Sequence, residues 1–404
     1  MTKPNSELIR KVFKDNNGIF RMIPVFVPRR ASSPGMRLRL HPDDLYALGL
    51  HRGPIKERWF SSIIKCSNGP DTAPDEGLSY VSYSDDPNDR FLFRDAVEEL
   101  GAELIGEDLM KTYGTWPMYS KFFDFGDPLP HHLHLGFEDA ARIGSPGKPE
   151  AYYFPPQYNN YPGSFPHTYF GFSPEVTKDQ VRERLECYET ADGRITELSR
   201  AFRIQLGTGW YTAPGVVHAP GSYLTYEPQW NADVNSHYEN ITRCDIYPYE
   251  QLVECCPEDK KRDMDYILGL MDWEKNVDPD YRKHYFRPPI VMAETPEYTQ
   301  KWIVYANPYL GGQELTVQPK CSVTIKNNTA YGCVVVQGRG KIGGYKAESP
   351  TMIRFGQLTA DEFFVSEATA REGVTIVNES DVEPMVILKH FGPNDPDTPK
   401  CTEE

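Results

Sequence analysis

The chain has 404 residues and carries 58 acidic against 43 basic side chains, a formal net charge of −15. This acidity, without a block of lysine and arginine, argues against nucleic acid as a partner. Hydrophobic residues make up 39% of the chain, which excludes a disordered protein and supplies a folded core. A single core seldom serves a chain of this length, so we expect two domains.

Two features predict where the protein resides. The N-terminal stretch MTKPNSELIRKVFKD has no apolar signal segment, and nowhere do about 18 uncharged apolar residues run together. The eight cysteines include no CxxC pair, which predicts reduced thiols rather than a disulfide framework. Together these features predict a cytoplasmic protein that does not associate with membranes.

The first 125 residues mix extended segments such as IFRMIPVFVP with a helical stretch over residues 93–113, where apolar residues recur at helical spacing. From Met118 onward, short strands alternate with proline and glycine turns, which predicts a small β-barrel. A helix is expected over residues 177–189, because Thr177 and Gln180 match a capping box. Its sparse apolar spacing predicts a surface helix over the barrel mouth.

The second half of the chain begins with residues 247–288, which are acidic, helical and punctuated by prolines, as expected of a connector. Residues 289–396 contain alternating runs such as GQELTVQP and GVTIVNES, which predict a second β-barrel. His390 is the only histidine there, so we expect no metal in this barrel. The predicted segments are therefore 1–246 with helical decorations, 247–288, 289–396 and a polar tail, 397–404.

Four metal-ligand side chains stand out in the N-terminal segment. His132 and His134 are two residues apart on a predicted strand, so both imidazoles leave the same face. Glu150 follows after a glycine and proline turn, and His218 follows a Pro-Gly turn further on. Three imidazoles and one carboxylate suit a divalent transition metal. The pattern predicts a metalloenzyme rather than a scaffold.

These motifs continue in an order that resembles the type I mannose-6-phosphate isomerase family, whose fold is a double cupin. The resemblance rests on IKERWFSS (55–62), WPMYSKFFDFGDPLP (116–130), HLH (132–134), KPEAYYF (148–154), PHTYFGFSPEVTKDQVRERL (166–185), APGVVHA (213–219) and YEPQWNAD (226–233). It implies an all-β dominated fold of two β-barrel jelly rolls with helical insertions. It also implies a sugar isomerase that interconverts an aldose and a ketose, a hexose or hexose phosphate, through an enediol.

The resemblance implies roles for further residues. One divalent metal ion is expected at the four ligands, zinc by resemblance, with manganese, iron or nickel also compatible with the donors. Glu227 matches the glutamate that carries the proton, and Lys148 and His237 would stabilise the developing oxyanion. Tyr152 and Lys148 would contact the substrate. The expected partner is a small carbohydrate, and a homodimer is left open.

Four positions depart from the family pattern. His132 replaces a glutamine ligand, Leu135 replaces a proline, and Pro130 replaces a serine that helps to hold the sugar phosphate. His237, nineteen residues beyond His218, replaces the catalytic arginine. Arginine is always charged, whereas histidine is mostly neutral at pH 7. We therefore expect mannose 6-phosphate to be a poor substrate and a free or acidic sugar to be a better one.

Two other functions fit the same residues. An iron or manganese cupin that works as an oxygenase or lyase on a small polar substrate often uses three histidines and one glutamate. A non-catalytic sugar-binding cupin would keep the barrel and lose the chemistry together with the arginine.

Overall fold

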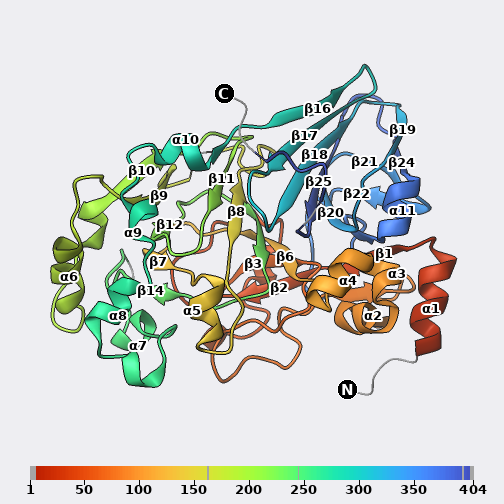
Figure 1. Ribbon diagram of the computed structural model, residues 1–404. Coiled ribbons are helices and arrows are strands. Elements are labelled where there is room, and N and C mark those ends of the chain that lie inside the picture. Colours follow the sequence, from red (N-terminus) through yellow and green to blue (C-terminus); the bar gives the residue numbers. More distant parts are fainter. Residues whose placement is uncertain (1–5, 162, 244, 394, 401–404) are drawn as a thin grey trace.

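A computed structural model describes residues 6–161, 163–243, 245–393 and 395–400. Its strands form four sheets, and every pair of neighbouring strands within them is antiparallel (Figure 1). Two sheets come mainly from the first 240 residues and two mainly from residues 290–391. The prediction of an all-β dominated fold with helical insertions is confirmed.

The N-terminal half contains a seven-stranded and a five-stranded sheet. The seven-stranded sheet has the order β15 (Phe286–Arg287), β11 (Gly209–Thr212), β8 (Glu150–Tyr153), β13 (Thr225–Trp230), β6 (Met118–Phe123), β3 (Ile55–Phe60) and β2 (Val25–Pro28). The five-stranded sheet has the order β10 (Ser199–Arg203), β9 (His167–Phe172), β12 (His218–Ala219), β7 (His132–Leu133) and β14 (Ser236–His237).

The C-terminal half contains a nine-stranded and a four-stranded sheet. The nine-stranded sheet has the order β16 (Ile290–Glu294), β17 (Tyr298–Val304), β18 (Gly311–Val317), β25 (Met385–Phe391), β20 (Tyr331–Gln337), β23 (Glu362–Val365), β1 (Ile19–Ile23), β4 (Tyr80–Ser82) and β5 (Arg90–Leu92). The four-stranded sheet has the order β19 (Ser322–Ile325), β24 (Val374–Asn378), β21 (Arg339–Ile342) and β22 (Tyr345–Glu348).

Strands from the start of the chain complete the C-terminal sheet. Ile19 of β1 pairs with Val365 of β23, and β4 and β5 extend the sheet beyond β1. The sheets therefore do not follow the segment boundaries expected from the sequence. The division into 1–246, 247–288 and 289–396 stays a prediction, and residues 401–404 of the expected tail lie outside the described residues.

Helices decorate the ends and edges of the sheets (Figure 1). They are α1 (Ser6–Asp15), α2 (Phe93–Leu100), α3 (Ala102–Ile105), α4 (Glu107–Tyr113), α5 (Phe137–Ala141), α6 (Lys178–Glu186), α7 (Tyr249–Leu252), α8 (Met264–Gly269), α9 (Trp273–Asn276), α10 (Tyr281–Tyr285) and α11 (Glu367–Glu372). Among the described residues, no helix combines the length and apolar character that crossing a bilayer requires.

Local sequence explains two of these helical regions. The stretch 93–113 forms three short helices because Gly101 and Gly106 take positive φ angles of 50° and 91°, which end α2 and α3. The capping box of α6 is confirmed, since the Thr177 and Gln180 side chains each accept a hydrogen bond from the other residue's backbone N–H. This helix packs against α8 at one end of the molecule.

The seven-stranded sheet stands between the two halves. Side chains alternate across it, so Lys121 and Glu227 share one face while Arg58 and Tyr226 leave the other. On that other face, the Arg58 guanidinium contacts Asp361 at 2.7 Å and the Tyr226 hydroxyl lies 2.8 Å from His390 Nδ1. The face that carries Lys121 and Glu227 is therefore available to form a site together with the five-stranded sheet.

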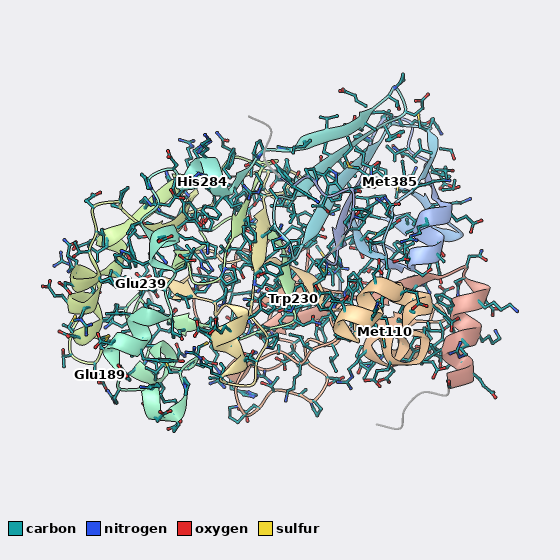
Figure 2. The ribbon with its side chains drawn as sticks, in the orientation of Figure 1. Met110, Glu189, Trp230, Glu239, His284 and Met385 are labelled. Atoms are coloured by element: carbon teal, nitrogen blue, oxygen red, sulfur yellow. The ribbon has the colours of Figure 1, made fainter. Side chains whose placement is uncertain are left out.

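Trp230, at the end of β13, joins elements from distant parts of the chain (Figure 2). Its ring packs edge-on against Tyr113 of α4, Phe137 of α5 and Tyr309, with ring centroids 5.4, 5.5 and 5.8 Å away. Such aromatic pairs add to the stabilisation that apolar burial provides. This packing fixes the end of the strand that carries Glu227.

Candidate metal centre and active site

The candidate ligands come from both N-terminal sheets. In the five-stranded sheet His132 pairs with His218 on one side and with His237 on the other. Glu150 opens β8 of the seven-stranded sheet, opposite Gln229 of β13. The predicted ligands therefore meet, and all four of their side chains are buried.

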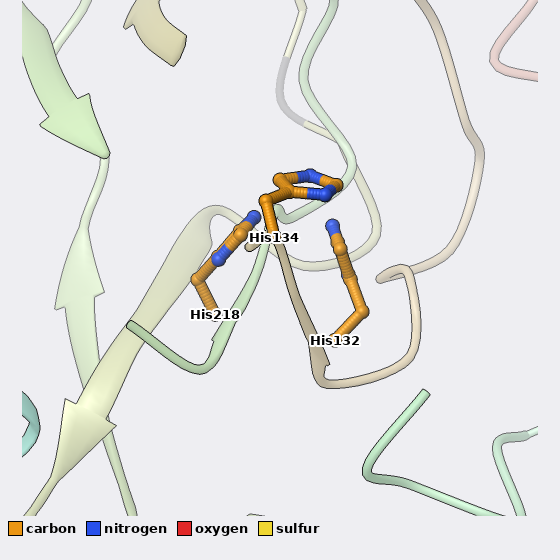
Figure 3. Close-up of side chains that lie close together, drawn as sticks. All are labelled: His132, His134 and His218. Carbon is orange, nitrogen blue, oxygen red and sulfur yellow. The ribbon is translucent and has the colours of Figure 1, made fainter. Parts of the chain in front are cut away.

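The three imidazoles gather with their ring nitrogens toward one another (Figure 3). One ligand nitrogen from each of His132, His134 and His218 lies within 4.8 Å of the other two. Each Nδ1 faces a backbone carbonyl, at 2.7 Å from Pro130, 3.1 Å from Val234 and 2.8 Å from Val216. A carbonyl only accepts, so each Nδ1 carries the proton and each Nε2 keeps its lone pair for a metal.

Glu150 completes this donor set. Its carboxylate oxygens lie 3.2 Å from His134 Nε2 and 3.0 Å from His218 Nε2. Glu150 Oε2 and His218 Nε2 are buried without an aligned hydrogen bond. Lone pairs of imidazole and carboxylate repel one another at this distance unless a cation lies between them. The residues present therefore fit one divalent transition metal.

The electrostatic environment keeps the donors in the states that bind metal. Burial, together with Lys148, lowers the pKa of His134 to about 3, and burial also lowers the pKa of His132 well below its usual value. Although burial opposes its charge, the ammonium of Lys148 helps to hold the pKa of Glu150 well below its usual value. Neutral imidazoles and an ionised carboxylate are the ligand forms that divalent metals require.

A cavity of about 490 Å³ opens over His132, His134 and Glu150. This volume falls within the range of about 300–1,000 Å³ that is usual for small-molecule sites. The other residues that the sequence predicted for the site also line it, namely Lys148, Tyr152, Glu227 and His237.

Glu227 is a buried carboxylate of this cavity that lies outside the donor set. It sits on β13 opposite Lys121 of β6, and its Oε1 lies 3.2 Å from Lys121 Nζ. Burial, reinforced by the charge of Glu150, raises the pKa of Glu227 from 4.5 to about 8, against the attraction of Lys121. A carboxyl group with such a pKa can both take and return a proton near neutral pH.

Lys148 and Tyr152 both contact the donor set directly. Lys148 Nζ lies 3.0 Å from His134 Nε2 and 3.3 Å from a Glu150 oxygen. The Tyr152 hydroxyl donates to the other Glu150 oxygen at 2.7 Å. Tyr152 therefore orients a ligand as well as lining the cavity.

His237 lies at the edge of the cluster, with its ring centroid 6.3 Å from that of His132. Its Nδ1 is 2.8 Å from the Gln251 side-chain oxygen, so Nδ1 carries the proton and Nε2 keeps a lone pair. Burial lowers the pKa of His237 to about 4, although the hydrogen bond to Gln251 opposes this shift. At neutral pH this residue is uncharged.

Comparison with solved structures relates this arrangement to known enzymes. The chain matches mannose 6-phosphate isomerase from Bacillus subtilis with a TM-score of 0.61 and 15% identity, covering 93% of this chain and 99% of that one. A zinc-bound mannose 6-phosphate isomerase matches with a TM-score of 0.60 and 10% identity, over 93% of this chain and 100% of that one. A phosphomannose isomerase variant from Salmonella typhimurium matches with a TM-score of 0.59 and 11% identity, over 93% of this chain and 100% of that one. No protein-family model and no curated protein matches the sequence.

The fold is that of the mannose-6-phosphate isomerases. At these identities the likeness establishes the β-dominated cupin architecture and leaves the reaction to be argued from the site.

Within this isomerase fold, sequence reasoning missed several cavity residues. Lys121, which the sequence analysis did not assign to the site, has a side chain that is only 8% exposed and faces Glu227. Arg29, Glu57 and Asp233 also line the cavity and were not predicted. Strand alternation could have found Lys121, because Tyr119 and Phe123 share its face. The other three are brought together only by tertiary structure. Arg142, by contrast, is half-exposed and pairs with Asp139 on α5.

Proposed function

We propose that this protein is a metal-dependent sugar isomerase that interconverts an aldose and a ketose, with zinc as its metal. The observation that carries the proposal is one cavity that is lined by His132, His134 and Glu150 of the donor set and by a separate buried carboxylate, Glu227. The zinc assignment is supported by the zinc-bound isomerase of the same fold. The partner is then a small carbohydrate.

The donor set would hold the metal through the Nε2 atoms of His132, His134 and His218 and a carboxylate oxygen of Glu150. When bound, the metal polarises the carbonyl and the neighbouring hydroxyl of the sugar. Backbone carbonyls fix the tautomer of all three imidazoles, and Tyr152 holds the carboxylate. These contacts pre-organise the ligands before any substrate arrives.

Glu227 would carry the proton. In the forward direction its carboxylate removes the proton from C2 of the aldose, giving an enediolate with its negative charge on O1. The C2 hydroxyl passes its proton to O1, and Glu227, whose proton can exchange with solvent in the meantime, delivers a proton to C1 to give the ketose. The electron pair of the broken C–H bond becomes the C1–C2 double bond and later the new C1–H bond. Lys121 orients the carboxylate through its contact at 3.2 Å.

Lys148 and His237 differ in what they can offer to the substrate. Lys148 places an ammonium beside the donor set, where it would stabilise negative charge on the substrate oxygens. His237 is neutral with an Nε2 lone pair, so the stabilisation of an oxyanion expected of it fits this geometry poorly. We assign it instead the acceptance of a hydrogen bond from a sugar hydroxyl.

The experiment is to load the purified protein with zinc and to follow a panel of hexoses and hexose phosphates by NMR. An aldose and its ketose should interconvert, the activity should vanish on chelation, and zinc should restore it. Oxygen consumption or bond cleavage without isomerisation would instead favour the oxygenase or lyase function that three histidines also permit. Sugar binding without turnover would favour a binding protein.

A further inference from the structure

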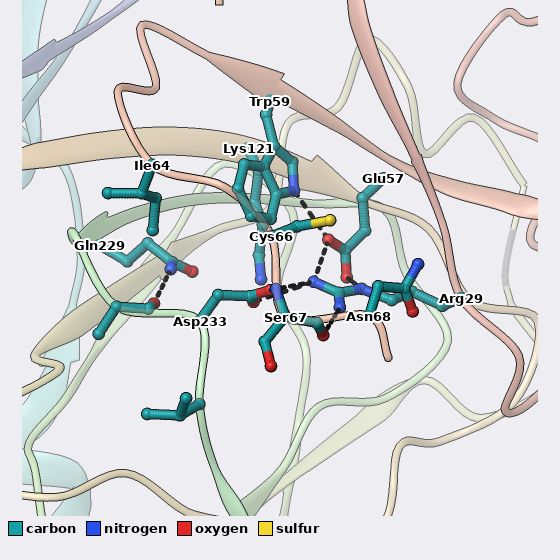
Figure 4. A network of polar contacts seen from close by, with 12 residues as sticks. Arg29, Glu57, Trp59, Ile64, Cys66, Ser67, Asn68, Lys121, Gln229 and Asp233 are labelled. Atoms are coloured by element: carbon teal, nitrogen blue, oxygen red, sulfur yellow. Dashed lines mark hydrogen bonds and ion pairs between the residues drawn. The ribbon is translucent and has the colours of Figure 1, made fainter. Parts of the chain in front are cut away.

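An ion-pair network forms the wall of the cavity beyond the donor set (Figure 4). The Arg29 guanidinium donates to both oxygens of Glu57, at 3.0 and 3.1 Å, and to both oxygens of Asp233, at 2.9 and 3.0 Å. It also donates to the Ser67 carbonyl at 3.1 Å. A guanidinium has five N–H groups, and here every nitrogen already has a partner. Two carboxylates thus share one cation.

The other cations of the cavity also have acidic neighbours. Lys121 pairs with Glu227, and Lys148 pairs with Glu150. Arg30 stands at the rim with a side chain that is 60% exposed, donates to a backbone carbonyl and lies 3.8 Å from Asp71. Its charge is therefore screened by water.

Acidic groups outnumber these cations. The cavity is lined by five acidic side chains, Glu57, Glu150, Glu227, Asp233 and Glu254, and by four basic ones, Arg29, Arg30, Lys121 and Lys148. Proteins hold phosphate or carboxylate groups with cations that have free donors, most effectively with an arginine fork. Neither Arg29, which already pairs with two carboxylates, nor the buried Lys121 and Lys148 offers such a fork. A dianionic phosphate would have to displace a buried carboxylate from its cation.

We propose that the substrate is an uncharged, unphosphorylated sugar, and that Arg29 bound between Glu57 and Asp233 sets this preference. The inference rests on the proposed isomerase function. Trp59 also donates to Glu57 and the Ser67 backbone N–H to Asp233, so each carboxylate accepts three hydrogen bonds. A carboxylate can accept about four, which leaves about one lone pair on each. Those lone pairs can accept hydrogen bonds from the hydroxyl groups of a neutral sugar and repel an anionic group. The network thereby excludes charged sugars rather than recognising them.

The experiment compares the zinc-loaded protein on matched substrates: a free hexose, its 6-phosphate and the corresponding hexuronate. The free hexose should be favoured in kcat/KM by on the order of 100-fold, because an anion leaves buried groups unpaired. Preference for the phosphate or the uronate would overturn the inference. Binding of the same three sugars, measured by calorimetry, decides the preference even if no sugar is isomerised, and equal binding of all three would also overturn it.

Variants test the network itself through inhibition by inorganic phosphate. Asp233→Asn removes the negative charge that faces Arg29 Nη2 and should strengthen phosphate binding roughly 10-fold, the scale of one hydrogen bond to a charged group. The matched control is Asp85→Asn, which breaks an arginine–aspartate pair with Arg21 at an aspartate that is 98% exposed. It should leave phosphate inhibition unchanged. Equal phosphate binding by Asp233→Asn and the parent protein would show that Arg29 does not govern the preference.

Discussion

At the scale of single residues, the site depends on which nitrogen of each histidine carries the proton. Backbone carbonyls accept from Nδ1 of His132, His134 and His218, so three lone pairs and the Glu150 carboxylate converge. Burial prevents water from relieving this repulsion, which makes a cation the natural partner. The proposal of a metal therefore rests on this arrangement as well as on the likeness to a zinc-bound isomerase.

The first prediction removes single ligands. His134→Ala and His218→Ala should each lose most of the bound zinc after dialysis, since a site with three of its four protein donors binds much more weakly. Metal content is measured by plasma mass spectrometry. His167→Ala, in β9 of the same sheet, and His390→Gln, in the C-terminal half, should keep one metal per chain. Full metal content in both ligand variants would contradict the assignment.

Much of the donor set could be predicted from the sequence. The spacing of His132 and His134 fixes their common face. The turn motifs place His218 on a strand, β12, that pairs with the strand of His132, and Glu150 on β8 of the other N-terminal sheet. The ion-pair network of Arg29, Glu57 and Asp233 could not be predicted, because Arg29 and Asp233 are 204 residues apart in the sequence. A charged residue considered alone also resembles a surface residue. Residues of this kind become visible only when the sheets are assembled.

At the scale of elements, β3 of the N-terminal half contacts residues 361–362 of the C-terminal half through Arg58. Arg58 of β3 donates to both oxygens of Asp361 at 2.7 and 2.9 Å and to Glu362 of β23 at 3.3 Å. The Arg58 and Asp361 side chains are 1% exposed or less. The sequence predicted strands on both sides of this contact but gave no sign that they pack together. It also missed that β1 joins β23, since strand pairing over such a distance leaves no local pattern.

The second prediction tests this contact. Asp361→Ala should lower the free energy of unfolding by about 3–5 kcal/mol, because it leaves a buried guanidinium without its main partner. Urea denaturation followed by fluorescence measures the change. Asp265→Ala removes an aspartate that is 85% exposed from its pair with Arg182, and it should cost no more than about 1 kcal/mol. Similar losses of unfolding free energy in both variants would show that the contact between β3 and residues 361–362 stabilises the fold no more than an exposed ion pair does.

At the scale of the whole molecule, buried histidines link stability to pH. Burial lowers the pKa of His390 from 6.5 to about 3, so the folded protein keeps this ring neutral while the unfolded chain protonates it. Its contribution to stability is present above pH 6.5 and is lost as pH falls toward 3. In that window each such histidine lowers the free energy of unfolding by about 1.4 kcal/mol per pH unit.

The third prediction follows from this linkage. The free energy of unfolding should fall between pH 7 and pH 4, and it should fall less steeply in His390→Gln, which has lost one titrating ring. Urea denaturation at several pH values gives the slope. His51→Gln replaces an exposed histidine and should keep the slope of the parent protein. An unchanged slope in His390→Gln would mean that this ring is not held neutral in the folded protein.

The most direct test of the account is proton exchange at C2 of the sugar. The zinc-loaded protein should exchange deuterium at C2 of a hexose with solvent, because Glu227 takes that proton during isomerisation. Glu227→Gln keeps the shape and the metal but lacks the base, so exchange and turnover should fall about 10²-fold or more while zinc content stays the same. Exchange at the parent rate in Glu227→Gln, or its absence from the parent protein with every sugar that binds, would contradict the account.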